Sequence, residues 1–96
     1  MGRNLADSRT APTRDTVRAR VREIITRLAP NPGALPPPGE HARLVEQLGY
    51  DSLALLELAF EVEETFGLRP MDVQTASTIH TSDELEAYVL RELRLD

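Results

Sequence analysis

Apolar residues recur at helical spacing in the N-terminal third of the chain. They stand at i, i+4, i+7, i+8 and i+11, which predicts a helix with Asp15 as its N-cap that runs to about Leu28 or Ala29. Pro30 ends this helix, because proline lacks the backbone N–H and disfavours a helical conformation in the residue before it. The predicted buried stripe consists of Val17, Val21, Ile24, Ile25 and Leu28.

A second amphipathic pattern predicts a helix from Ser52 to about Phe66, with Gly67 as its C-terminal stop. At about 100° per residue, one arc of the helix forms a core face. That face contains Leu55, Leu58, Ala59, Val62 and Phe66. The roughly opposite side carries Glu57, Glu61 and Glu64. Leu53 and Phe60 lie at the border, so this helix has a mixed acidic and apolar flank that a core does not require.

Two further helices follow Arg69-Pro70. Met71 to Ala76 fits a short helix that begins near Asp72. The last helix has a strong start, because Thr81 and Glu84 stand at the N-cap and N3 positions of a capping box. Its predicted buried stripe consists of Leu85, Tyr88, Val89 and Leu93.

The connections complete a prediction of an all-α fold. Residues 30–40 hold five prolines and are interpreted as a stiff spacer, with a proline-rich docking motif as the alternative. The stretch from His41 to Leu48 has apolar residues for a turn of helix that pins the loop to the core, namely Leu44, Val45 and Leu48.

No segment alternates with a period of two. We therefore expect a small four-helix bundle of three longer helices and one short one, with a long loop after the first helix. Residues 1–13 are predicted to be a disordered tail, and residues 14–96 the helical domain.

Composition narrows the possible functions. The 96 residues fit one domain at most, and the chain has no cysteine, so it has no disulfide, no thiolate metal site and no cysteine nucleophile. No stretch approaches the roughly 18 apolar residues of a membrane span, and no signal-peptide pattern opens the chain, so a cytoplasmic location is expected. The net charge is −5, and the acids concentrate after residue 36. This acidic body disfavours nucleic acid and favours partners with a basic surface.

Ser52 is the candidate for chemistry, because it opens the acidic second helix in the run Gly49-Tyr50-Asp51-Ser52-Leu53. A serine at the start of a helix exposes its hydroxyl beside free backbone N–H groups. The alternative is that Ser52 simply caps the helix. A catalytic serine is disfavoured, since the chain has no nucleophile elbow and its core is too small for a substrate pocket. His41 and His80 show no metal-ligand pattern and are interpreted as ordinary surface or loop residues.

The run Leu48 to Leu53, followed by Leu56-Glu57-Leu58 and by Glu61 to Gly67, closely resembles the acyl carrier protein family. The resemblance covers about residues 14–93 and includes the approach to the last helix. It implies a carrier, not an enzyme, that receives a 4′-phosphopantetheine arm from coenzyme A on Ser52. Acyl intermediates are then held as thioesters on the arm. It also implies a phosphopantetheinyl transferase, a loading enzyme and a downstream synthase or transferase as partners. We expect a monomer without a metal site.

The resemblance also assigns partner-binding residues. Asp51 is similar to the acidic residue beside the serine, and Leu53 to an exposed leucine that partners grip. Acidic positions of the recognition helix are matched by Glu57, Glu63 and Glu64. Phe60 and Glu61 depart from the usual residues on this face, and we expect them to contact partners as well. For the acids the alternative is a solvated helix face, and for Leu53 and Phe60 it is a core edge.

The departures favour a polyketide or other specialised bacterial pathway over the common fatty-acid carrier. Ala54 stands where many fatty-acid carriers have another acid, and the first helix is rich in arginine. An aminoacyl or peptidyl carrier of a nonribosomal-peptide-type pathway is the main alternative, and an unmodified helical adaptor is a further one. Asp51 before Ser52 favours the acyl type, because peptidyl carriers more often have a glycine-rich approach to the serine.

Overall fold

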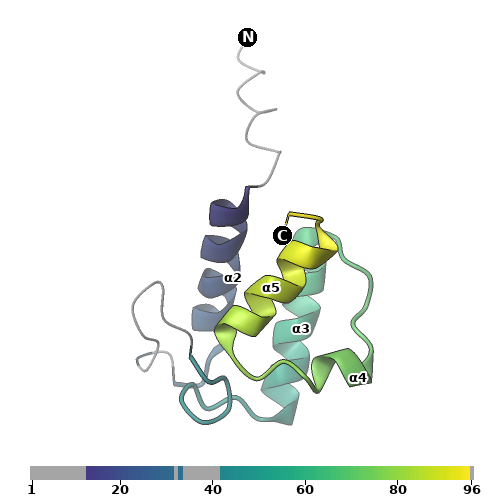
Figure 1. The fold of residues 1–96 in the computed structure, drawn as a ribbon. Helices are drawn as coiled ribbons and strands as arrows, with labels where there is room; N and C mark the ends of the chain where they lie inside the picture. Colours follow the sequence, from purple (N-terminus) through teal and green to yellow (C-terminus); the bar gives the residue numbers. More distant parts are fainter. Residues whose placement is uncertain (1–12, 32, 34–41, 96) are drawn as a thin grey trace.

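The computed structural model describes residues 13–31, 33 and 42–95. In this part of the chain, three longer helices and one short helix form a small bundle (Figure 1). The helices are α2 (Arg14–Leu28), α3 (Ser52–Phe66), α4 (Val73–Ala76) and α5 (Ser82–Glu92). Helix α2 packs against both α3 and α5 and runs antiparallel to them. The prediction of an all-α bundle is confirmed.

Some predictions fall on residues outside this description. They are the tail at residues 1–12, most of the proline-rich spacer (residues 32 and 34–40) and His41.

Helix α2 begins earlier than the sequence pattern indicated, because its N-cap is Thr13 and not Asp15. The Thr13 hydroxyl accepts a hydrogen bond from the Thr16 N–H at 3.2 Å, and the Thr13 N–H donates to the Thr16 hydroxyl at 2.9 Å. These reciprocal bonds satisfy two backbone donors at the helix start. Asp15 lies in the first turn instead, where its negative charge interacts favourably with the positive end of the helix dipole.

One hydrophobic core joins α2, α3, α5 and the segment that precedes α3. The buried apolar residues are Val17, Val21, Ile24, Ile25, Ala29, Ala42, Leu44, Leu48, Tyr50, Leu58, Val62, Leu85, Tyr88, Val89 and Leu90. The predicted stripes of α2 and α5 are largely confirmed, with Leu28 and Leu93 only partly buried. On α3 only Leu58 and Val62 are buried, while the other predicted core residues are partly exposed: Leu55, Ala59 and Phe66.

The segment 42–50 forms turns that lie against α5 and α2. Its Leu44 N–H donates to the His80 carbonyl at 2.9 Å, and the Ser82 N–H donates to the Ala42 carbonyl at 2.8 Å. Leu44 and Leu48 are buried as predicted, whereas Val45 is 53% exposed and does not pin the segment. These backbone bonds position the chain just before α3.

The helix ends follow local signals that the sequence shows. Gly67 ends α3 with a φ of 67°, a left-handed conformation in which glycine avoids the strain of a Cβ. Asp72 caps α4, as the prediction of a helix start near this residue requires. Thr81 and Glu84 form the predicted capping box of α5.

Candidate functional site

Ser52 is the first residue of α3, and Asp51 before it is the N-cap. The Asp51 carboxylate accepts a hydrogen bond from the Ala54 N–H at 2.8 Å, so Asp51 is the N-cap. The alternative in which Ser52 caps the helix is therefore wrong. Ser52 is exposed, and its hydroxyl has no hydrogen-bond partner in the described part of the chain. The hydroxyl is free for reaction with an incoming group.

Tyr50 fixes the turn that presents Ser52, a role that the sequence pattern did not reveal. Its ring is 1% exposed, and its hydroxyl donates to the Ile25 carbonyl of α2 at 2.7 Å. Burial raises the pKa of Tyr50 to about 12, because the phenolate form would lose its hydration. The Tyr50 N–H also donates to the Leu44 carbonyl at 3.0 Å. The serine-bearing turn is thus attached to the core two residues before Ser52.

The outer face of α3 carries large apolar side chains that the core does not cover. Leu53, Leu56 and Phe60 are 65%, 67% and 63% exposed. Their spacing of i, i+3 and i+7 places them on one stripe that continues from Ser52. The border position predicted for Leu53 and Phe60 agrees with this exposure. Leu56 was not predicted as a surface residue, although its helical-wheel position outside the core arc was an available signal.

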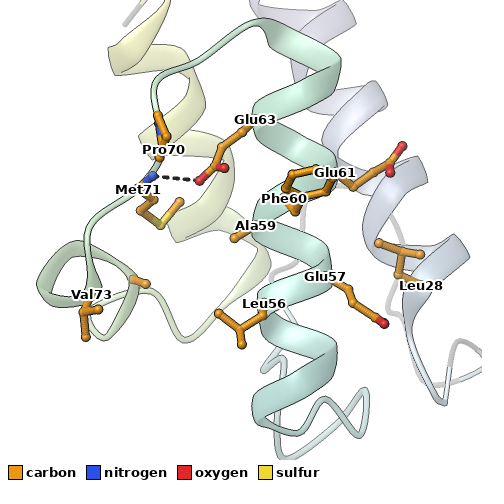
Figure 2. Close-up of a pocket in the computed structure, with 11 residues that line it drawn as sticks. Leu28, Leu56, Glu57, Ala59, Phe60, Glu61, Glu63, Pro70, Met71 and Val73 are labelled. Carbon is orange, nitrogen blue, oxygen red and sulfur yellow. Dashed lines mark hydrogen bonds between the residues drawn. The ribbon is translucent and has the colours of Figure 1, made fainter.

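A groove runs over the outer face of α3, from Leu28 of α2 to the segment that leads into α4 (Figure 2). Its volume is about 810 Å³. Leu56, Ala59 and Phe60 line it from α3, and Met71 and Val73 line it from the other side. Val73 is 83% exposed, so the apolar surface extends from α3 onto α4. An apolar groove with a polar rim is the usual form of a protein-docking surface.

The four glutamates of α3 differ in their surroundings. Glu57 and Glu64 are exposed and make no hydrogen bond or ion pair within the described ranges. Glu61 pairs with Arg27 of α2 at 2.8 Å. Glu63 accepts a hydrogen bond from the Met71 N–H at 2.7 Å and thereby holds the loop that lines the groove. Neither the Arg27 pair nor the Met71 bond was foreseen, because each joins residues from different elements.

No group of three or more metal-ligating side chains occurs in residues 13–31, 33 and 42–95. His80 is exposed, and its backbone N–H donates to the Glu84 carboxylate at 2.7 Å. This bond is the main reason that the pKa of Glu84 lies below its usual value. None of the helices in these ranges combines the length and the apolar character that crossing a bilayer requires.

Ser52 is thus an exposed, unpartnered serine at the start of an acidic helix in a small bundle. The family model for the phosphopantetheine attachment site matches residues 16–89, and the chain belongs to this family. The domain is the site of covalent 4′-phosphopantetheine attachment, and its members are typically carriers and not catalysts. Comparison with individual curated proteins found no match.

Proposed function

We propose that this protein carries acyl groups on a 4′-phosphopantetheine arm attached to Ser52. The observation that carries the proposal is that Asp51, and not Ser52, caps the start of α3. Asp51 accepts the hydrogen bond of the Ala54 N–H, and the exposed Ser52 hydroxyl is left without a partner. Nothing in the described chain fixes the Ser52 side chain in place, so the hydroxyl is accessible to a modifying enzyme.

The helix terminus at Ser52 favours a phosphate, whereas the neighbouring Asp51 carboxylate opposes one. The serine stands at the N1 position of a 15-residue helix, whose free N–H groups and dipole favour an anion. In the transfer, the Ser52 Oγ forms a bond to phosphorus while the pyrophosphate of coenzyme A breaks. Adenosine 3′,5′-bisphosphate leaves, and the hydroxyl proton passes to a base on the transferase. The attached arm supplies a terminal thiol, which this cysteine-free chain lacks, for holding acyl groups as thioesters.

The partners of this carrier dock on a defined surface, which we name the docking face. It consists of Leu53, Leu56, Glu57, Phe60, Glu64 and Val73. Its large exposed apolar residues supply contact area, and the two unpartnered glutamates attract basic partner surfaces. The proposed partners are a phosphopantetheinyl transferase, an acyl-loading enzyme and a downstream synthase or transferase. Asp51, beside the serine, contributes a further negative charge.

The proposed setting is a polyketide or other specialised pathway in the cytoplasm, with the protein acting as a monomer. Phe60 and Glu61 support this setting, because they depart from the residues common in fatty-acid carriers at these positions. Asp51 supports an acyl cargo over an aminoacyl one.

Intact-mass measurement tests the proposal. The protein is incubated with coenzyme A, magnesium and a broad-specificity phosphopantetheinyl transferase. We expect one added arm on the native protein and none on Ser52→Ala, with the helical circular-dichroism spectrum unchanged. Ser77→Ala removes another exposed serine and serves as the matched control that accepts the arm normally.

Two results would contradict the proposal. The first is a native protein that stays unmodified while a known carrier in the same reaction is fully loaded. The second is an arm that still appears on Ser52→Ala. An unmodified helical adaptor predicts the first result, so this measurement separates the two functions.

A further inference from the structure

One ion pair of the described structure connects α2 to α3, and it lies at the edge of the docking face. The Arg27 guanidinium donates to the Glu61 carboxylate with an Nη2–Oε2 distance of 2.8 Å. The other two pairs in the described residues lie elsewhere. Arg18 faces Glu86 of α5 at 4.0 Å, and Arg20 faces Glu23 within α2 at 3.6 Å. The Arg27–Glu61 pair is thus the shortest of the three, with the length of a charge-assisted hydrogen bond.

The neighbours of this pair line the groove. Glu61 is itself a lining residue, and so are Phe60 before it and Leu28 beside Arg27. Figure 2 shows Glu61 reaching from α3 toward the helix that carries Leu28, with the Phe60 ring on the front of α3. The docking face therefore ends at a positive charge contributed by α2. A partner that contacts Glu61 comes close to Arg27.

The pair changes the charge that α3 presents to a partner. Four glutamates and no basic residue lie in Ser52–Phe66. Glu63 is engaged by the Met71 N–H and Glu61 by Arg27, which leaves Glu57 and Glu64 as the unpartnered acids. Arg27 occupies one oxygen of the Glu61 carboxylate and offsets its charge, so a basic side chain of a partner gains less from Glu61 than from Glu57 or Glu64.

We propose that Arg27 determines partner specificity by withholding Glu61 from the basic docking surfaces of partner enzymes. Such enzymes bind through Glu57 and Glu64, and a partner whose basic residues are placed only for Glu61 is disfavoured. This inference rests on the proposed carrier function. The side chains of Arg27 and Glu61 are 51% and 40% exposed, so the pair is screened by solvent and its effect is moderate.

A double-mutant cycle on arm transfer tests the inference. The variants are Arg27→Gln, Glu61→Gln and the double variant, and kcat/KM for a phosphopantetheinyl transferase is measured at low salt. We expect Arg27→Gln to raise kcat/KM roughly two- to fivefold, the range that an exposed ion pair allows. Glu61→Gln should lower kcat/KM less than twofold in the native background and roughly three- to fivefold in the Arg27→Gln background, where Glu61 is free to contact the partner.

Arg20→Gln is the matched control. It removes the same charge from α2 and releases a glutamate, but that glutamate lies on α2 and not on the docking face. We expect a smaller rise in kcat/KM than for Arg27→Gln, and added salt should reduce all of these differences.

The outcomes separate this inference from the proposed function. Equal effects of Glu61→Gln in the two backgrounds would overturn the role of Arg27 and leave the carrier function standing. A rise no larger for Arg27→Gln than for Arg20→Gln would do the same, because it would reflect net charge alone. Failure of the native protein to accept any arm would overturn both.

Discussion

Helices α3 and α5 use their apolar residues in opposite ways. The 11 residues of α5 include five buried ones, which are Ser82, Leu85, Tyr88, Val89 and Leu90. The 15 residues of α3 include only two buried ones, although α3 is the more apolar helix. Its surplus side chains, Leu53, Leu56 and Phe60, face outward beside the groove. Because the core of a small domain needs only one stripe of each helix, the second stripe on α3 is available for partners.

The largest expected effects compare buried leucines on the two helices. Leu58→Ala on α3 and Leu85→Ala on α5 should each lower the free energy of unfolding by about 2–5 kcal/mol, because each leaves a cavity in the same core. Leu56→Ala, two residues before Leu58, should change it by no more than about 0.5 kcal/mol. Urea unfolding measures all three. A similar loss for Leu56→Ala and Leu58→Ala would remove the distinction between the two faces of α3.

The two tyrosines provide the next comparison. Tyr50→Phe should cost about 1–3 kcal/mol, because the Ile25 carbonyl loses a buried donor. Tyr88→Phe on α5 should cost less, since the Tyr88 hydroxyl makes no hydrogen bond in the described part of the chain. Thermal unfolding of the two variants checks this order. Equal losses would show that the Tyr50 bond does not fix the turn before Ser52.

The pKa values of the same two tyrosines predict a loss of stability at alkaline pH. Burial raises the pKa of both Tyr50 and Tyr88, with Tyr50 reaching about 12 against an ordinary value of 10.0. A raised folded-state pKa means that the unfolded chain loses its proton first. The contribution of the protonated tyrosines to the free energy of unfolding is therefore complete below pH 10 and is lost as the pH rises toward 12. Tyr50→Phe should lessen this decline when unfolding is followed across that range.

The helix caps are expected to contribute less. Asp51→Ala should lower the free energy of unfolding by about 0.5–2 kcal/mol, and Thr81→Ala on α5 by a similar amount. Asp51→Asn keeps a capping side chain and should be nearly neutral for stability. If Asp51 also attracts partners, Asp51→Asn should slow arm transfer without destabilising the fold. Unchanged transfer by Asp51→Asn would limit Asp51 to capping.

The smallest effects on stability belong to the docking face. Phe60→Ala should change the free energy of unfolding by no more than about 0.5 kcal/mol but slow arm transfer severalfold, because an exposed aromatic residue at an interface is a frequent binding anchor. Val45→Ala removes another exposed apolar side chain, one that does not line the groove, and should leave transfer unchanged. Equal transfer rates for the two variants would contradict the proposed docking face.

Much of the fold follows from local sequence signals. The apolar periodicity of α2 and α5, the Thr81–Glu84 capping box and the glycine stop at Gly67 depend on residues a few positions apart, and the structure agrees with each. The predicted N-cap of α2 was wrong because Thr13 and Asp15 are both good capping residues. Only the paired bonds of Thr13 with Thr16 decide between them.

The sequence by itself determined the helices, the acidic outer side of α3 and the place of Ser52 at its start, since spacing along a helix sets which residues share a face. The tertiary structure decided which of those residues are free. Glu61 is engaged because Arg27 arrives from α2, and Tyr50 is anchored because Ile25 lies across the core. These contacts join residues 34 and 25 positions apart, and no local pattern encodes such pairings.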